Sequence, residues 1–371
     1  MEKTNVFAYY FPNWHPTARN DVWHGKGWTE WEVVKHASPR FEGHKQPKIP
    51  LWGYEDESKI EVMEKKIEAA ASHGLDGFIF DWYWFEDGSY RIDCLDKAFL
   101  GAKNNTDLKF AVMWANHDPI YVHPASRVYT APPLMSGDIS PEAFLKATDH
   151  CINTYFTQPN YFRIDGKAYF GFFNFMKLRN HFGGDQATRL IFDDFRRRAK
   201  EAGVGELHID ITIDAMLPAF QKDKEAVNNM LKTCGIDSCS CYGSPRDTNQ
   251  FPKVPYNDCI TASVKAYETN AKLCDFPCYI NVSSGWDSSP RTVPSEGYDN
   301  IGYPFCNIIH DSTPELFEEF LKSAKKFSDS KEWCKVITIF AWNEWTEGGY
   351  LEPDDEYGYR RLEAIKRVFS N

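Results

Sequence analysis

Two glutamates near the end of the chain, Glu344 and Glu347, have the types and spacing that acid–base chemistry needs. They lie three positions apart, beside Trp342 and Trp345, directly after the apolar run 335–340. Two neighbouring carboxyl groups can divide the work, because one can protonate a leaving oxygen while the other activates the attacking group. Indole rings offer flat apolar faces on which a sugar ring can stack. The pattern therefore indicates chemistry on a glycosidic bond.

The spacing of this pair constrains the backbone that carries it. An extended backbone sends residues three apart to opposite sides, whereas a turn or helical segment brings both to one face. We therefore expect a buried strand over 336–342 that breaks near Trp342 and is followed by a turn. Aromatic desolvation and the neighbouring charge would raise the pKa of one carboxyl group and keep it protonated near neutral pH.

Apolar, β-branched or aromatic runs of strand length recur along the chain, with amphipathic stretches between most of them. Strands are expected at 6–11, 77–82, 109–114, 168–173, 207–213, 236–242, 277–282 and 336–342. Helices are expected at 56–72, 141–156, 186–202, 222–233, 258–273 and 314–328. This alternation, without a Ser/Gly-rich linker, predicts an α/β fold: a (β/α)8 TIM barrel forming a single domain over residues 1–371. A doubly wound sheet would need a Gly-rich turn after the first strand, where residues 11–16 offer Pro and bulky aromatics instead of glycines.

Long segments rich in Trp, Tyr, Pro and Asp follow four of these strands. They are 12–55, 115–140, 243–257 and 283–304. Helix-to-strand connections look short by comparison. Because active sites of TIM barrels are built from the loops at the carboxyl ends of the strands, we expect the long loops and the site on that face.

Polar and aromatic residues near strand ends and in these loops are candidate sugar contacts. Asp81 can accept a hydrogen bond from a sugar hydroxyl, although Asp is also a common cap. Trp286 offers a stacking face, while Asp287 and Arg291 suit directional bonds to hydroxyls or to a substrate acid, with a loop-internal salt bridge as the alternative. The expected substrate-binding residues are Tyr10, Glu30, Asp81, Trp82, Trp84, Trp114, Asn116, Trp286, Asp287, Arg291, Asn343 and Trp345.

The amino-acid composition excludes several classes of binding partner and cofactor. The formal charge is −11 and no Lys/Arg-rich stripe occurs, which argues against nucleic acid and anionic membranes as partners. The histidines 15, 24, 44 and 117 and the ten cysteines lack the close spacing of metal ligands, so no metal or cofactor is expected. No apolar run approaches about 18 residues, so no membrane span is expected. A strand-like run begins at Val6 and leaves no room for a signal peptide, which predicts a cytoplasmic protein, or a periplasmic or secreted one if a leader has been removed. The oligomeric state stays open.

Several motifs together resemble a known family. They are 8–16, 20–31, 41–44, 77–85, 285–291, 342–348 and 351–353. The sequence resembles the glycoside hydrolase family 99-like barrels, and more closely the WbsX-like branch of bacterial polysaccharide-locus proteins. The resemblance spans almost the whole chain, and its Trp-rich motifs are specific.

This resemblance implies a retaining glycoside hydrolase acting on a carbohydrate. It implies that Glu344 acts as a base on the 2-hydroxyl of the sugar, giving a transient 1,2-anhydro sugar. It also implies that Glu347 protonates the leaving oxygen and later deprotonates water. The WbsX-like branch also carries a glycosyltransferase label, so a glycosyltransferase of polysaccharide biosynthesis is an alternative, although no Asp-x-Asp motif or nucleotide-binding turn is seen. A non-catalytic carbohydrate-binding barrel is a third possibility, which the two acids disfavour.

Overall fold

Eight parallel strands form the centre of the molecule. The computed structural model describes residues 4–246 and 249–370. The strands are β1 (Asn5–Tyr10), β2 (Gly77–Phe85), β4 (Lys109–Trp114), β6 (Lys167–Phe172), β7 (Leu207–Thr212), β8 (Ser238–Ser240), β10 (Cys278–Ser283) and β12 (Val336–Phe340). They pair in chain order, and β1 pairs with both β2 and β12, which closes the sheet into a barrel. The predicted (β/α)8 barrel is confirmed.

Each expected strand region overlaps one of these barrel strands, but some ends differ. Strand β2 runs on to Phe85 because its last residues pair with the short antiparallel strand β3 (Gly88–Tyr90). Strand β8 keeps only three of the seven expected residues. Strand β12 ends at Phe340, two residues before the expected end, so the break falls just before Trp342. Strand β5 (Arg163–Ile164) adds a second antiparallel edge, against β6.

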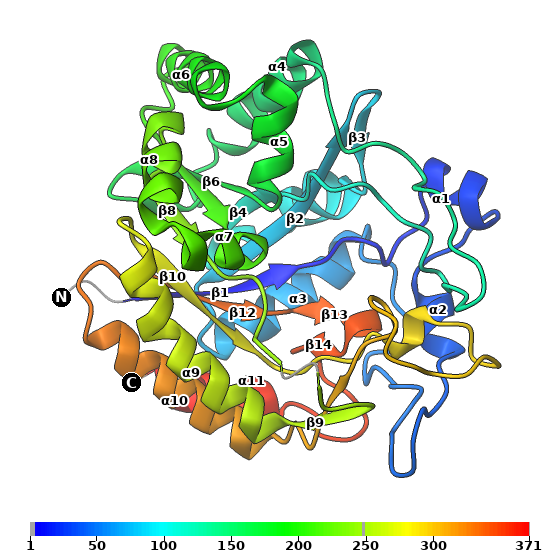
Figure 1. Cartoon of the computed structure of the whole chain (residues 1–371). Helices are drawn as coiled ribbons and strands as arrows, with labels where there is room; N and C mark the ends of the chain where they lie inside the picture. The colour runs from blue at the N-terminus through cyan, green and yellow to red at the C-terminus, as the bar shows by residue number, and fades with distance from the viewer. Residues whose placement is uncertain (1–3, 247–248, 371) are drawn as a thin grey trace.

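Helices surround the barrel on its outside (Figure 1). Those between successive strands are α3 (Ile60–Ser72), a π-helical segment Cys94–Phe99, α4 (Pro141–His150), α5 (Phe175–Phe182), α6 (Asp185–Glu201), α7 (Leu217–Lys222), α8 (Lys224–Cys234), α9 (Tyr256–Leu273) and α10 (Pro314–Asp329). Helix α11 (Arg360–Phe369) follows the last barrel strand, and α1 (Ala18–His24) and α2 (Trp31–Lys35) lie in the first loop. No helix among the described residues is long and apolar enough to cross a membrane.

Helix α10 shows how local sequence builds this outer layer. Thr313 caps it by accepting a hydrogen bond from the backbone N–H of Leu316, and Pro314 occupies the first turn. Phe317 and Phe320, spaced for one helix face, are fully buried against the barrel. The same kind of periodicity made six of the helices predictable from sequence.

Other helices were not expected, namely α1, α2, α5, α7 and α11. The first expected helix also begins late, at Ile60 instead of Asp56. The reason is Glu57, which is fully buried and accepts hydrogen bonds from the Tyr10 hydroxyl and the Trp14 backbone N–H, both 2.8 Å away. These bonds hold the residues around Glu57 in the first loop.

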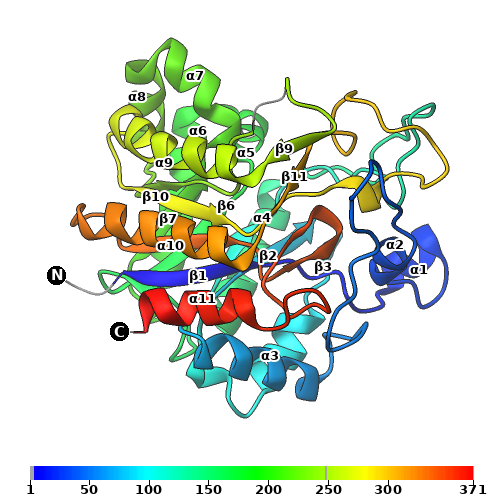
Figure 2. The same cartoon turned by 90° about the horizontal axis from the view of Figure 1, so that it is seen from below.

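The long loops gather at one end of the barrel. Both views place α1 and α2 at the carboxyl ends of the strands, opposite the start of β1 and the end of α11 (Figures 1 and 2). Arg40 of the first loop donates hydrogen bonds to the carbonyl oxygens of Val293 and Pro294 in the loop after β10. The Ala125 N–H donates to the Arg291 carbonyl at 2.7 Å, so the loop after β4 is tied to the same segment. The expected loops therefore form the C-terminal face of the barrel.

Part of this face is a small parallel pair, β9 (Lys253–Pro255) with β11 (Ile308–His310). Strand β9 lies in the expected loop 243–257, of which residues 247–248 lie outside the described residues. A second short pair, β13 (Asn343–Glu344) with β14 (Gly349–Tyr350), is antiparallel and follows β12. Of the two glutamates that the sequence singles out, Glu344 lies in β13 and Glu347 in the turn that joins β13 to β14.

Candidate active site

The expected break after the last barrel strand is a tight turn. Glu344 ends β13, and the 3-10 turn Trp345–Glu347 carries the chain over to β14. Asn343 holds the start of this turn against the end of β1, because its side chain accepts from the Phe11 N–H at 2.8 Å and donates to the Phe11 carbonyl at 3.0 Å. Both glutamates thereby reach the same face of the barrel.

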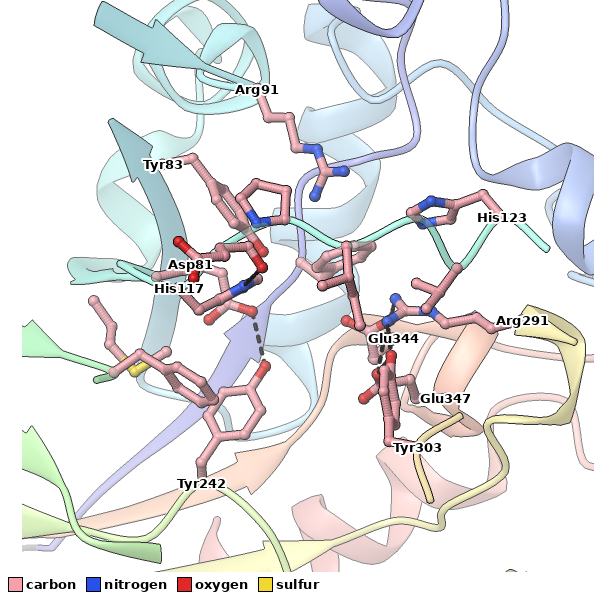
Figure 3. A pocket seen from close by; sticks show the side chains of 18 of the residues that line it. Asp81, Tyr83, Arg91, His117, His123, Tyr242, Arg291, Tyr303, Glu344 and Glu347 are labelled. Atoms are coloured by element: carbon pink, nitrogen blue, oxygen red, sulfur yellow. Dashed lines mark hydrogen bonds and ion pairs between the residues drawn. The ribbon is translucent and has the colours of Figure 1, made fainter. Parts of the chain in front are cut away.

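Arg291, in the 3-10 turn Ser289–Arg291 after β10, joins the two glutamates. Its Nη1 lies 2.7 Å from Oε1 of Glu347, and its Nη2 lies 2.8 Å from Oε1 of Glu344. Tyr303 adds a hydroxyl that donates to Oε1 of Glu347 at 2.6 Å. Figure 3 shows these four side chains in one group. One guanidinium therefore sets the relative positions of both carboxyl groups.

Glu30 supports this group from behind. It is fully buried, and its Oε1 lies 2.9 Å from Nη2 of Arg291. Burial by itself would raise the pKa of Glu30, but Arg291 and His123 bring that pKa well below its usual range. Burial, together with the charges of Glu347 and Glu30, raises the pKa of Glu344 well above its usual value, although Arg291 opposes the shift.

A cavity of about 330 Å³ lies in front of the glutamates. It is lined by Phe11, Asp81, Tyr83, Tyr90, Arg91, Met113, Ala115, His117, Asp118, Pro119, Ile120, Val122, His123, Phe173, Tyr242, Trp286, Arg291, Tyr303, Glu344 and Glu347. The lining comes from the carboxyl ends of strands all round the barrel and from the loops that follow them. Its size and its mixture of aromatic and ionisable groups are those of a small-molecule site.

Asp81 forms part of the inner wall of this cavity and lies midway along β2. Its Oδ2 accepts a hydrogen bond of 2.8 Å from the Tyr242 hydroxyl, while its Oδ1 has no partner among the described residues. Burial, with a smaller contribution from the charge of Glu347, raises the pKa of Asp81 to about 8. The carboxyl group is therefore mostly protonated at neutral pH and can donate as well as accept a hydrogen bond.

The structure brings five of the expected residues to the cavity: Asp81, Trp286, Arg291, Glu344 and Glu347. It does not bring Trp82, Trp84 or Trp114 there. Successive side chains on a strand point to opposite faces, so Asp81 and Tyr83 face the barrel mouth while Trp82 and Trp84 face the helices. Accordingly, the indole N–H of Trp82 donates to the Tyr155 hydroxyl at 3.1 Å.

The remaining expected residues hold neighbouring segments in place, away from the cavity. Tyr10 bonds to Glu57 under α3, and Asn116 donates to the Asn174 carbonyl at 2.8 Å. Asn343 and Glu30 have the roles described above. Trp345 is fully buried, and its indole N–H donates to Glu352 at 2.7 Å. Asp287 accepts from Gln46 and lies 2.8 Å from Nε2 of His44, which fastens the first loop to the loop after β10.

Several cavity residues were not expected from sequence, among them Tyr83, Arg91, His123, Tyr242 and Tyr303. The alternation along β2 predicts Tyr83 once Asp81 is assigned to the inner face. Tyr242 lies at the end of an expected strand, which is also a usable signal. Arg91, His123 and Tyr303 lie on loops, where no periodicity indicates the direction of a side chain. Among the described residues, no group of three or more His, Cys, Asp or Glu side chains is arranged to hold a metal ion.

This closed barrel, with paired acids at its C-terminal mouth, has a glycoside-hydrolase-like fold. The family model described as Glycosyltransferase WbsX matches residues 6–365, and the chain belongs to this family. The predicted family resemblance is thus confirmed. Two curated proteins, both called uncharacterized protein WxcX and coming from two strains of Xanthomonas campestris pv. campestris, are 26% identical to it over 390 residues. The match covers 98% of this chain and 49% of each of them, so the chain spans about half the length of the curated relatives it matches.

Solved structures share the fold. A GH99 endo-alpha-mannosidase from Bacteroides thetaiotaomicron, in complex with bis-tris-propane, superposes with a TM-score of 0.61 at 14% identity, covering 99% of this chain and 96% of the mannosidase. A protein described as glycoside hydrolase-like gives a TM-score of 0.60 at 16% identity, covering 100% of this chain and 94% of its own. At these identities the likeness concerns the fold alone.

Proposed function

We propose that this protein is a retaining glycoside hydrolase that cleaves a polysaccharide or an oligosaccharide with Glu344 and Glu347. The observation that carries the proposal is that both carboxyl groups line one cavity at the C-terminal mouth of the barrel, bridged by Arg291. Trp286 and Tyr83 line the same cavity and offer aromatic faces to a sugar ring. The GH99 endo-alpha-mannosidase with the same fold supports this class of chemistry, and its activity makes α-mannosides a first substrate to assay.

The two glutamates take different roles in this proposal. Glu344 removes the proton of the sugar's 2-hydroxyl, and the 2-oxygen attacks the anomeric carbon to form a 1,2-anhydro sugar. A base must be ionised, and Arg291, whose Nη2 lies 2.8 Å from Oε1 of Glu344, favours the ionised form of this carboxyl group. Glu347 protonates the departing oxygen and then deprotonates the water that opens the anhydro ring. Two inversions retain the anomeric configuration.

The test compares two variants on two kinds of leaving group. Glu347→Gln should lower the rate of cleavage of glycosides with poor leaving groups by about 10²-fold or more. It should slow the cleavage of activated aryl glycosides far less, since an aryl oxide departs with little protonation. Glu344→Gln should slow the cleavage of both kinds of glycoside, because formation of the anhydro ring needs a base whichever leaving group departs. Glu356→Gln, in the same C-terminal segment but bound to Lys45 and Lys48 outside the cavity, is the control and should keep full activity. Near-normal turnover of a 2-deoxy glycoside would contradict this route.

A second candidate function is glycosyl transfer, which the description of the family favours. One assay distinguishes hydrolysis from transfer. In it, the protein is incubated with glycans, with nucleotide sugars, or with both. Hydrolysis without a nucleotide sugar supports the glycosidase. Product formed only with a nucleotide sugar supports the transferase, whereas binding without either reaction supports a non-catalytic carbohydrate-binding barrel.

A further inference from the structure

Arg91 lies at the cavity and has no acid partner. It follows the β2–β3 hairpin, and no Asp or Glu among the described residues lies within ion-pair distance of its guanidinium. Arg291, by contrast, is paired with three carboxylates. Of the other acids that line the cavity, Asp118 lies 2.9 Å from Lys177, and Asp81 accepts a hydrogen bond from Tyr242. Figure 3 shows Arg91 across the cavity from the Arg291 group. Arg91 thus supplies the cavity with a positive charge that has no ion-pair partner among the described residues, while Glu30 acts on it only at longer range.

Aromatic rings hold this guanidinium in place. Its Cζ lies 4.5 Å from the ring centroid of Tyr90, 5.0 Å from that of Tyr83 and 5.5 Å from that of Phe11. Such stacking orients the planar group, and its Nε–H has no hydrogen-bond partner among the described residues. The side chain of Arg91 is therefore already ordered before a ligand binds, so that binding loses little of its conformational entropy.

The backbone at Arg91 is also unusual. Its φ is 59°, in the left-handed region that residues with a Cβ rarely adopt. The other non-glycine residues with positive φ in the described chain are Asp165 and Asp311, a residue type that tolerates this region better. Strained backbone of this kind concentrates at ligand-binding positions. The nearby His117 and His123 do not add charge at neutral pH, because burial lowers the pKa of both.

We propose that Arg91 binds an acidic substituent of the sugar substrate, a carboxylate or a sulfate or phosphate ester, so that the protein acts on an acidic glycan. A guanidinium edge matches the two oxygens of such a group with two parallel hydrogen bonds. The position of the acid follows from the cavity: it lies on the side away from Glu344 and Glu347, where like charges repel it least. The statement that the anion is part of a substrate rests on the proposed function. The statement that Arg91 binds an anion is independent of it.

The test measures binding without turnover. Glu347→Gln protein is titrated with glucuronic, galacturonic and mannuronic acids, with hexose 6-sulfates and 6-phosphates, and with the neutral parent hexoses, by calorimetry at low salt. At least one acidic sugar should bind tenfold or more tightly than its parent. Adding Arg91→Met to this protein should remove the preference for the acidic sugar and change the affinity for the neutral sugar less than twofold. Arg91→Lys keeps the positive charge but loses the planar guanidinium that makes two parallel hydrogen bonds. Its preference for the acidic sugar should lie between those of the protein that keeps Arg91 and the Arg91→Met variant. Comparison of the uronic acids, the 6-sulfates and the 6-phosphates identifies which anion is bound.

Arg19→Met is the matched control. Arg19 also stacks on Tyr90, at 5.1 Å, but it is paired with Asp87 at 2.9 Å and does not line the cavity. It should leave the preference for acidic sugars unchanged. The proposal is overturned if no acidic sugar binds more tightly than its parent, or if Arg91→Met weakens acidic and neutral sugars equally. Acid preference in a protein that cleaves no glycan would instead count against the proposed function alone.

Discussion

At the scale of single residues, one guanidinium balances the charge of the candidate active site. Arg291 is almost completely buried and contacts Glu30, Glu344 and Glu347 within 2.9 Å. A buried charge that loses its partner costs far more than an exposed one, because nothing replaces the lost solvation. Both the stability of the site and its chemistry therefore depend on the Arg291 side chain.

Arg291→Met should lower the free energy of unfolding by about 3–5 kcal/mol, because it leaves buried carboxylates without their counter-charge. Urea denaturation followed by tryptophan fluorescence measures the change. Arg127→Met removes a partly exposed pair with Asp299 and should cost less than about 1 kcal/mol. Equal losses in the two variants would show that the three carboxylates are not held by Arg291.

Asp81 gives a pH dependence with a definite sign. Its pKa is about 8 in the folded protein against 3.8 for an ordinary Asp, so between these values the folded state holds a proton that the unfolded state has lost. The free energy of unfolding therefore falls as pH rises through this window, by at most about 1.4 kcal/mol per pH unit. Asp81→Asn cannot ionise, and its stability relative to the wild type should grow from pH 5 to pH 8 and then level off.

Thermal melts of the two proteins across this pH range measure the effect. Asp87→Asn, on the same hairpin but exposed, is the control and should show no such trend. A difference between Asp81→Asn and wild type that stays constant from pH 5 to pH 8.5 would mean that Asp81 is ionised throughout.

At the scale of elements, the site depends on two loops that touch through their backbones. The Asp287 N–H, after β10, donates to the Glu347 carbonyl at 2.6 Å. The next residue, Gly348, has φ +70°, and a Cβ there would lie 2.7 Å from the backbone nitrogen of Asp287. Only glycine therefore lets the turn that carries Glu347 approach the loop that carries Arg291 so closely.

Gly348→Ala should consequently lower both the melting temperature and activity, because the two loops must move apart. Gly166→Ala is a matched control, since Gly166 has φ +78° but nothing within 4 Å of its would-be Cβ. Both variants bear the left-handed penalty of about 1–2 kcal/mol, so any further loss in Gly348→Ala measures the contact with Asp287. Identical behaviour of the two variants would contradict a tight packing role for Gly348.

At the scale of the whole molecule, closure of the barrel joins the first and last strands. Strand β1 pairs with both β2 and β12, and one continuous apolar core extends from Val6 to Phe369. No subset of strands covers the barrel interior without the others. We therefore expect a single thermal unfolding transition in calorimetry. Two well-separated transitions would contradict the prediction of one domain over the chain.

The proposed chemistry is carried by side chains alone, as proton transfers at two carboxyl groups. Activity should accordingly survive exhaustive chelation, measured as initial rates before and after dialysis against a chelator. A loss that is restored by adding back a divalent ion would contradict the expectation of a cofactor-free enzyme.

Much of this protein was predictable from sequence because its signals are local. The eight strands, most of the interstrand helices and the face of the barrel with the long loops follow from the period of apolar residues and from loop lengths. The Glu344–Glu347 pair could be placed at the barrel mouth because it directly follows an apolar strand. Strict use of the two-residue period would also have assigned Tyr83, and not Trp82 or Trp84, to the cavity.

Other features were decided only by tertiary structure. Arg291 meets Glu30 across 261 positions of sequence, and Asp287 meets His44 across 243, contacts that no local pattern encodes. Arg91 and Tyr303 reach the cavity from loops, whose side-chain directions depend on what they pack against. The raised pKa of Asp81 likewise results from burial by distant segments, because desolvation depends on the whole surrounding volume and not on the neighbouring residues in the chain.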